Sequence, residues 1–107
     1  MALPKRLYGP ALLTDAAATV YTVPAGRVAV VRNIHVVNGT AGDLTFTASI
    51  GADAAASRIF DGETVSAETT YDCFAPFVLS AGETLQAYAS AAASLVLTID
   101  GEEELVA

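Results

Sequence analysis

The sequence predicts an all-β domain: an antiparallel β-sandwich of about eight or nine short strands in jelly-roll or Greek-key-like order. Three observations lead to this prediction. Short apolar or alternating segments recur about every ten residues, turn residues separate them, and no stretch has a helical period. The order in which the strands connect is not encoded in these local patterns.

The predicted sheet is organised around the stretch from Tyr21 to Asn38. A short strand, 19–23, is followed by Pro24-Ala25-Gly26 and then by the longest β-branched run in the chain, 27–37. Pro24 presets φ for a turn, and Gly26 can take the positive φ that closes it. We therefore expect the two strands to fold back on each other as a hairpin.

The run 27–37 carries apolar side chains on both faces. Strict alternation places on one face Val28, Val30, Ile34 and Val36, a row that Arg32 interrupts. The opposite face then carries Ala29, Val31, Asn33, His35 and Val37. A strand that is apolar on both sides is covered twice, either inside its own domain or by another subunit.

The rest of the chain supplies further strands. Residues 44–50 alternate without error, so we expect Thr45, Thr47 and Ser49 to face water while the other side faces the core. Residues 51–57 are too few for a stable helix and are predicted to form a loop. Asp61-Gly62 and Asp100-Gly101 are expected to form turns. The remaining expected strands are 58–60, 64–67, 69–74, 77–79, 84–90 and 95–99, with 11–14 and 102–106 as candidates for two more.

Length and composition indicate one small domain. We expect residues 11–107 to form a single sandwich, preceded by an extended N-terminal arm, 1–10, that lies on its own sandwich or on a neighbour. Apolar residues make up 53% of the chain, but many are alanine, aromatic residues are 7% and Trp is absent. Cys73 is the only cysteine, so no internal disulfide can form. A domain with so little bulky material obtains additional burial from neighbouring subunits, and we expect a homo-oligomer.

The charge balance and the chain's apolar runs exclude two classes of partner. The formal net charge is −7, and nucleic-acid backbones would be repelled by it, so we expect no nucleic-acid binding. Pro10 and Asp15 interrupt the first apolar stretch, which therefore does not resemble a secretion signal, and no run approaches the ~20 residues of a membrane span. We expect synthesis in a cytoplasm and no membrane partner.

The residues indicate no catalytic or metal site. His35, the only histidine, is expected to form a hydrogen bond near a sheet edge, because no other His and no nearby Cys or Ser would make it a ligand or a base. Cys73 lies in an aromatic segment and is expected to be a small buried side chain. The acidic run 100–104 lacks the ligand spacing of a calcium loop and reads as a solvated charge cluster. We expect no enzyme activity and no cofactor.

Three stretches together resemble a known family. They are RLYGPALLTDAAATVYTVPAGRVAVVRNIHVVN (6–38), SIGADAAASRIFDG (49–62) and LSAGETLQAYAS (79–90). As a series, they are similar to small minor tail or minor structural proteins of tailed bacteriophages, and the similarity covers nearly the whole chain. This resemblance implies a non-enzymatic building block of a virion, with cyclic symmetry and no catalytic residues.

The expected function is that of a minor tail component, at the tail tip or a fibre, which forms a trimer and contacts larger virion proteins of the tail or capsid. Its expected location is the virion, assembled in the bacterial cytoplasm. Two alternatives stay open: a decoration protein that clamps the capsid shell, and a carbohydrate-binding module that uses Tyr8, Tyr21, Tyr71 or Tyr88 as sugar platforms. The expected partner interface comprises Leu3, Leu7, Tyr8, Val31, Asn33, His35 and Val37.

Overall fold

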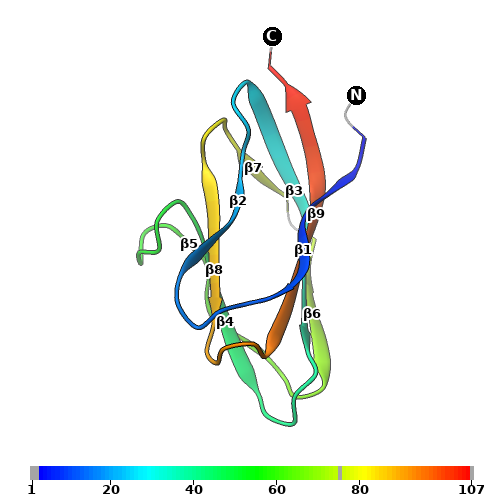
Figure 1. The fold of residues 1–107 in the computed structure, drawn as a ribbon, viewed down its shortest axis with the longest axis vertical. Helices are drawn as coiled ribbons and strands as arrows, with labels where there is room; N and C mark the ends of the chain where they lie inside the picture. The colour runs from blue at the N-terminus through cyan, green and yellow to red at the C-terminus, as the bar shows by residue number, and fades with distance from the viewer. Residues whose placement is uncertain (1–2, 75, 107) are drawn as a thin grey trace.

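The computed structural model describes residues 3–74 and 76–106. Within them the chain forms nine strands in two antiparallel sheets packed face to face, which confirms the predicted β-sandwich (Figure 1). Sheet A consists, in spatial order, of β1 (Lys5–Leu12), β9 (Leu95–Leu105), β3 (Arg27–Asn38) and β6 (Thr69–Cys73), and β7 (Phe77–Leu79) also pairs with β3. Sheet B consists of β2 (Ala18–Thr22), β8 (Thr84–Ala89), β4 (Leu44–Ile50) and β5 (Arg58–Val65).

The connections make this sandwich a jelly roll. Strands β6 and β7 lie along the same edge of β3, so together they act as one interrupted strand. The chain passes from one sheet to the other at every remaining connection except the one between β4 and β5, which pair with each other. The resulting order is that of the double-sheet jelly roll, one of the two arrangements that the sequence left open.

The predicted hairpin between 19–23 and 27–37 is wrong. The turn itself forms, because the Arg27 amide donates to the Pro24 carbonyl oxygen at 3.2 Å and Gly26 has φ of 75°. However, β2 pairs with β8 in sheet B, and β3 pairs with β9 in sheet A. Strands β2 and β3 each have a row of side chains that faces the core. These two rows can pack against each other only when the strands lie in opposite sheets. The turn therefore carries the chain across the sandwich.

The two faces of β3 also differ from the prediction. Arg32 and Asn33 together oppose Asp100 of β9, which makes a β-bulge. Before the bulge Ala29 and Val31 are fully buried, and after it Ile34 and Val36 are. The extra residue shifts the alternation, so the prediction that Val28, Val30, Ile34 and Val36 share one face is wrong: Val28 and Val30 lie on the face opposite to the buried Ile34 and Val36. Arg32, the charged residue that interrupts the predicted row, lies at the bulge.

The two Asp-Gly pairs lie inside strands. Strand β5 continues through Asp61-Gly62 with register shifts against β4, and β9 continues through Asp100-Gly101 to Leu105. The predicted turns at both places are therefore wrong. At Gly101 the absent side chain has a steric reason, because a Cβ there would lie 2.0 Å from the carbonyl oxygen of Val30.

The expected N-terminal arm is extended and lies on its own sandwich. Residues Lys5–Leu12 form the edge strand β1, which pairs with β9, and the strand runs through the expected boundary between residues 10 and 11. Its register shifts twice, between Arg6 and Tyr8 and between Tyr8 and Ala11. Residues 1 and 2 of the expected arm lie outside the described residues.

The core lies between the sheets and mixes large with very small side chains. Its largest fully buried members include Phe46, Leu79, Leu85 and Leu95. Phe46 also contacts the rings of Phe60 and Tyr71, with centroids 5.2 and 5.6 Å away. The core alanines are Ala29, Ala48, Ala87 and Ala89. Alanine buries little area, and at about 25 cal/mol per Å² the hydrophobic stabilisation from β8 in particular is small.

Candidate interaction surfaces

Four of the seven residues predicted for a partner interface lie in β3, and the bulge decides what they do. Val31 is 0% exposed and belongs to the core, so it cannot contact a partner. Asn33 lies in the bulge, and its Oδ1 atom is buried with no hydrogen-bond partner among the described residues. His35 and Val37 alternate with the buried Ile34 and Val36 and therefore face outward.

The other three predicted residues come from the N-terminal segment. Leu3 is 80% exposed. Leu7 and Tyr8 instead pack against the core beneath β1. The structure thus brings only His35 and Val37 together on one outward surface, the outer face of sheet A, and leaves Leu3 exposed before β1 begins.

The outer face of sheet A has an apolar row at the end where β9 begins. Val37 lies opposite Val96 on β9, and Val96 lies opposite Leu12 on β1. Toward the other end of the sheet, Val30 lies opposite Val78 of β7, which is 65% exposed. Sequence analysis missed Leu12, Val96 and Val78, although their alternation with the buried Leu13, Leu95 and Leu79 was a usable signal.

Charged side chains lie between these two apolar groups. His35 Nδ1 lies 2.5 Å from Asp72 Oδ1 on β6, and Arg32 Nη2 lies 3.4 Å from Glu102 Oε2 on β9. Arg6 of β1 lies opposite Asp100 of β9. Each of these three carboxylates therefore has a cationic or imidazole neighbour on the adjacent strand or in the bulge.

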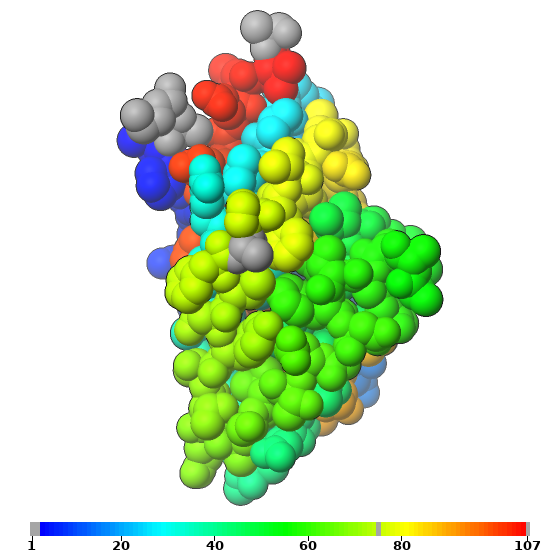
Figure 2. All heavy atoms as spheres, turned by 180° about the vertical axis from the view of Figure 1, so that it is seen from behind, coloured from blue at the N-terminus to red at the C-terminus, as the bar shows by residue number. Residues whose placement is uncertain are grey.

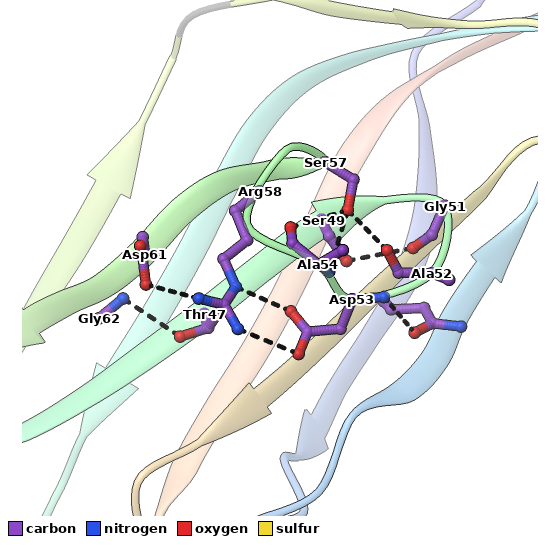
Figure 3. Close-up of polar contacts among 11 residues, drawn as sticks. Thr47, Ser49, Gly51, Ala52, Asp53, Ala54, Ser57, Arg58, Asp61 and Gly62 are labelled. Atoms are coloured by element: carbon purple, nitrogen blue, oxygen red, sulfur yellow. Dashed lines mark hydrogen bonds and ion pairs between the residues drawn. The ribbon is translucent and has the colours of Figure 1, made fainter.

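The outer face of sheet B is different, because a loop covers the part of it that β4 forms. Residues 51–57 stand out from the side of the domain, as Figures 1 and 2 show from opposite directions, and fold over β4 (Figure 3). Thr47 is only 5% exposed and Ser49 only 1%. The predicted wet face of 44–50 is therefore wrong at these two positions: Ser49 donates to the carbonyl oxygen of Gly51 in the loop, and Thr47 accepts from the amide of Gly62 in β5.

Arg58 holds this loop in place. Its Nε and Nη2 atoms donate to both carboxylate oxygens of Asp53 at 2.9 and 3.3 Å, and Nη1 donates to Asp61 at 3.1 Å (Figure 3). The hydrogen bonds from Arg58 lower the pKa of Asp53, and those to Asp53 raise the pKa of Arg58. The guanidinium thus binds two carboxylates, and its bonds to Asp53 fix the loop to the beginning of β5.

A third cluster lies inside the sandwich, at the end where β9 finishes. Glu103 accepts hydrogen bonds from Tyr21 of β2 and from Lys5 Nζ of β1, the latter at 2.9 Å, so it links both sheets. Its side chain is 8% exposed. These two hydrogen bonds lower the pKa of Glu103, whereas burial, with the bond to Glu103, raises the pKa of Tyr21. The predicted solvated charge cluster at 100–104 is therefore wrong for Glu103.

Replacing Glu103 with glutamine is expected to lower the free energy of unfolding by about 1–2 kcal/mol at pH 7. A carboxylate whose folded pKa is depressed stabilises the fold above its ordinary pKa of 4.5, and that stabilisation is lost as pH falls through the folded value. The difference between wild type and variant should therefore shrink below pH 4.5. Urea unfolding at a series of pH values measures it.

The control for this prediction is Glu104→Gln, which makes the same change in net charge at an exposed position of the same strand. The difference in unfolding free energy between the two variants therefore gives the contribution of the buried carboxylate to stability. A difference from wild type that is equal for both variants at pH 7 would contradict the linking role of Glu103.

The described residues hold no group of three or more His, Cys, Asp or Glu side chains placed to bind a metal ion. Residues 3–74 and 76–106 also contain no helix long and apolar enough to cross a membrane. Cys73 is half-buried and packs against the core. Of the four tyrosines considered as sugar platforms, Tyr8, Tyr21 and Tyr71 pack into or against the core, which leaves Tyr88.

Comparison with known proteins bears on the fold of this chain. No family model matches the chain, and no curated protein matches it either. Two chains among the solved structures match it. One comes from the disulfide-linked pili of Bacillus endospore appendages, with a TM-score of 0.54 and 14% identity over 99% of this chain and 89% of that chain. At this identity the likeness shows a shared β-sandwich fold.

Proposed function

We propose that this protein is a non-enzymatic structural component of a bacteriophage virion, a minor tail protein that assembles with copies of itself. The observation that carries the proposal is the set of large apolar side chains left at the surface of so small a domain. Six large apolar residues are more than half exposed: Leu3, Leu12, Phe74, Val78, Leu105 and Val106. Leu12 adjoins Val96 and Val37, and Val78 adjoins Val30, and contiguous apolar groups of this kind mark contacts with other proteins.

The composition of the core supports the same proposal. Four core positions are alanine, and the one thiol cannot form an internal disulfide. Contacts with neighbouring subunits would add the burial that the isolated sandwich lacks. A structural role also agrees with that of the pilus proteins that share the fold, and the sequence resemblance to minor tail proteins supplies the virion as the place of assembly.

Two measurements test the proposal. Light scattering of the purified protein should give a mass near three times the chain mass of 10.9 kDa. Quantitative mass spectrometry of purified particles should find the protein in a few copies per particle, with antibody labelling at the tail. Many copies on the head would instead indicate a capsid decoration protein, and absence from particles would overturn the virion role.

A further inference from the structure

We propose that the outer face of sheet A is the surface through which this protein assembles, and that its partner there is a second copy of the same chain. The inference rests on the proposed function, because it names the contact that a self-assembling structural protein would use. In a trimer, this face of each copy would turn toward the three-fold axis, where one part of the face meets a different part of the face on the neighbouring copy.

The face combines apolar contact area with a position that the fold itself leaves uncovered. The row of Leu12, Val96 and Val37 crosses three adjacent strands, and Val30 with Val78 forms a second apolar group. Leu12 is 53% exposed and Val78 is 65% exposed. By contrast, part of the outer face of sheet B is covered over β4, where the 51–57 loop bonds Ser49 and Gly62 of β5 bonds Thr47.

The charges on this face favour its burial. Removing a charge from water is costly unless an opposite charge accompanies it. Glu102 pairs with Arg32, and Asp72 lies within hydrogen-bond distance of His35. These two carboxylates therefore keep a polar partner when the face is dehydrated.

The distribution of charge also selects a copy of this chain as the partner. On the outer face of sheet A, Arg6 and Arg32 lie among four carboxylates, Asp72, Asp100, Glu102 and Glu104, while Lys5 is bonded to Glu103 inside the sandwich. Outside sheet A the chain has seven acidic residues and only Arg58, which is already engaged by Asp53 and Asp61. Two copies that meet through the outer face of sheet A can set Arg6 or Arg32 of one copy against a carboxylate of the other.

The sheet edges offer a poorer route to assembly. Strands β1, β2 and β5 have register shifts, and the remaining edge is divided between β6 and β7. Irregular and short edges discourage the addition of a strand from another chain. Packing through a face remains the favoured route.

The test places one lysine at a time on the proposed face. Leu12→Lys and Val78→Lys change largely exposed positions, so the fold should survive, which far-UV circular dichroism and the melting temperature verify. The matched control is Thr22→Lys, at an exposed position of β2 in sheet B. Each variant reduces the net negative charge by the same amount, so a general change in repulsion affects all three equally.

Sedimentation equilibrium over a concentration series then decides the inference. Leu12→Lys and Val78→Lys should each raise the dissociation constant of the oligomer at least about tenfold, while Thr22→Lys stays within about twofold of wild type. If the two sheet A variants assemble as wild type does, the inference is wrong but self-assembly stands. If the wild-type protein is monomeric at every concentration, the proposed self-assembling role fails before the variants are compared.

Discussion

Replacing Gly101 with alanine is expected to destabilise the domain by at least about 3 kcal/mol. The new Cβ would lie 2.0 Å from the carbonyl oxygen of Val30 and 3.0 Å from Cδ1 of Leu7. The leucine side chain can move, but the carbonyl belongs to β3, which pairs along most of its length with β9 and with β6 and β7. Relieving the overlap therefore requires β3 and β9 to separate at the centre of sheet A.

Urea unfolding of the Gly101→Ala variant measures this effect. The matched control is Gly39→Ala, because an added Cβ there meets no atom within 4 Å. This control should change the free energy of unfolding by no more than about 0.5 kcal/mol. Equal stability of the two variants would show that the strands at Gly101 yield more easily than their pairing indicates.

Replacing Asn38 with alanine is the second large expected effect, a loss of about 3 kcal/mol. Asn38 is 1% exposed and ends β3, where the chain crosses to sheet B. Its Nδ2 donates to the carbonyl oxygens of Gly42 and Val65, both at 2.9 Å. Its Oδ1 accepts from the amide and the hydroxyl of Thr40. One side chain thus ties the crossing loop to the end of β5, and alanine would leave several of these groups without a partner.

Comparison of Asn38→Ala with Asn38→Asp separates the two halves of this network. The aspartate keeps the acceptor for Thr40 but loses both donors, so it cannot satisfy Gly42 and Val65. We expect it to be destabilised as well, because a buried carboxylate would then face two carbonyl oxygens. Thermal unfolding of both variants checks the prediction, and a melting temperature unchanged from wild type in either would contradict the linking role.

Asn38 shows what local sequence patterns can predict about a residue and what they cannot. Asn38-Gly39 is a dipeptide typical of turns, and a loop does follow at 39–43. The local pattern did not show that the asparagine side chain would be buried and bonded to Val65, because Val65 is 27 residues away. The asparagine side chain bonds to backbone groups of the loop that crosses between the sheets and of β5. Which backbone groups need such a partner depends on the sheet that the next strand joins.

The candidate interface was likewise predicted correctly at some positions and wrongly at others. His35 and Val37 were predicted to face a partner, and they do lie on an outward surface, whereas Val31, on the same predicted face, is in the core. One bulge separates the two outcomes. A strand's alternation predicts its faces only while the count of residues matches that of its neighbours, and Arg32 and Asn33 break the match.

The sequence by itself determined the fold class, most strand positions and the acidic, single-cysteine character of this protein. These features are local, because alternation and turn residues act over a few neighbouring positions. Only the tertiary structure decided which strands pair, that the Pro24 turn crosses the sandwich, and that the 51–57 loop lies over β4 of sheet B. Those outcomes depend on contacts between distant segments, such as β1 with β9, whose partners are set by the joint filling of one core and not by any single stretch of the chain.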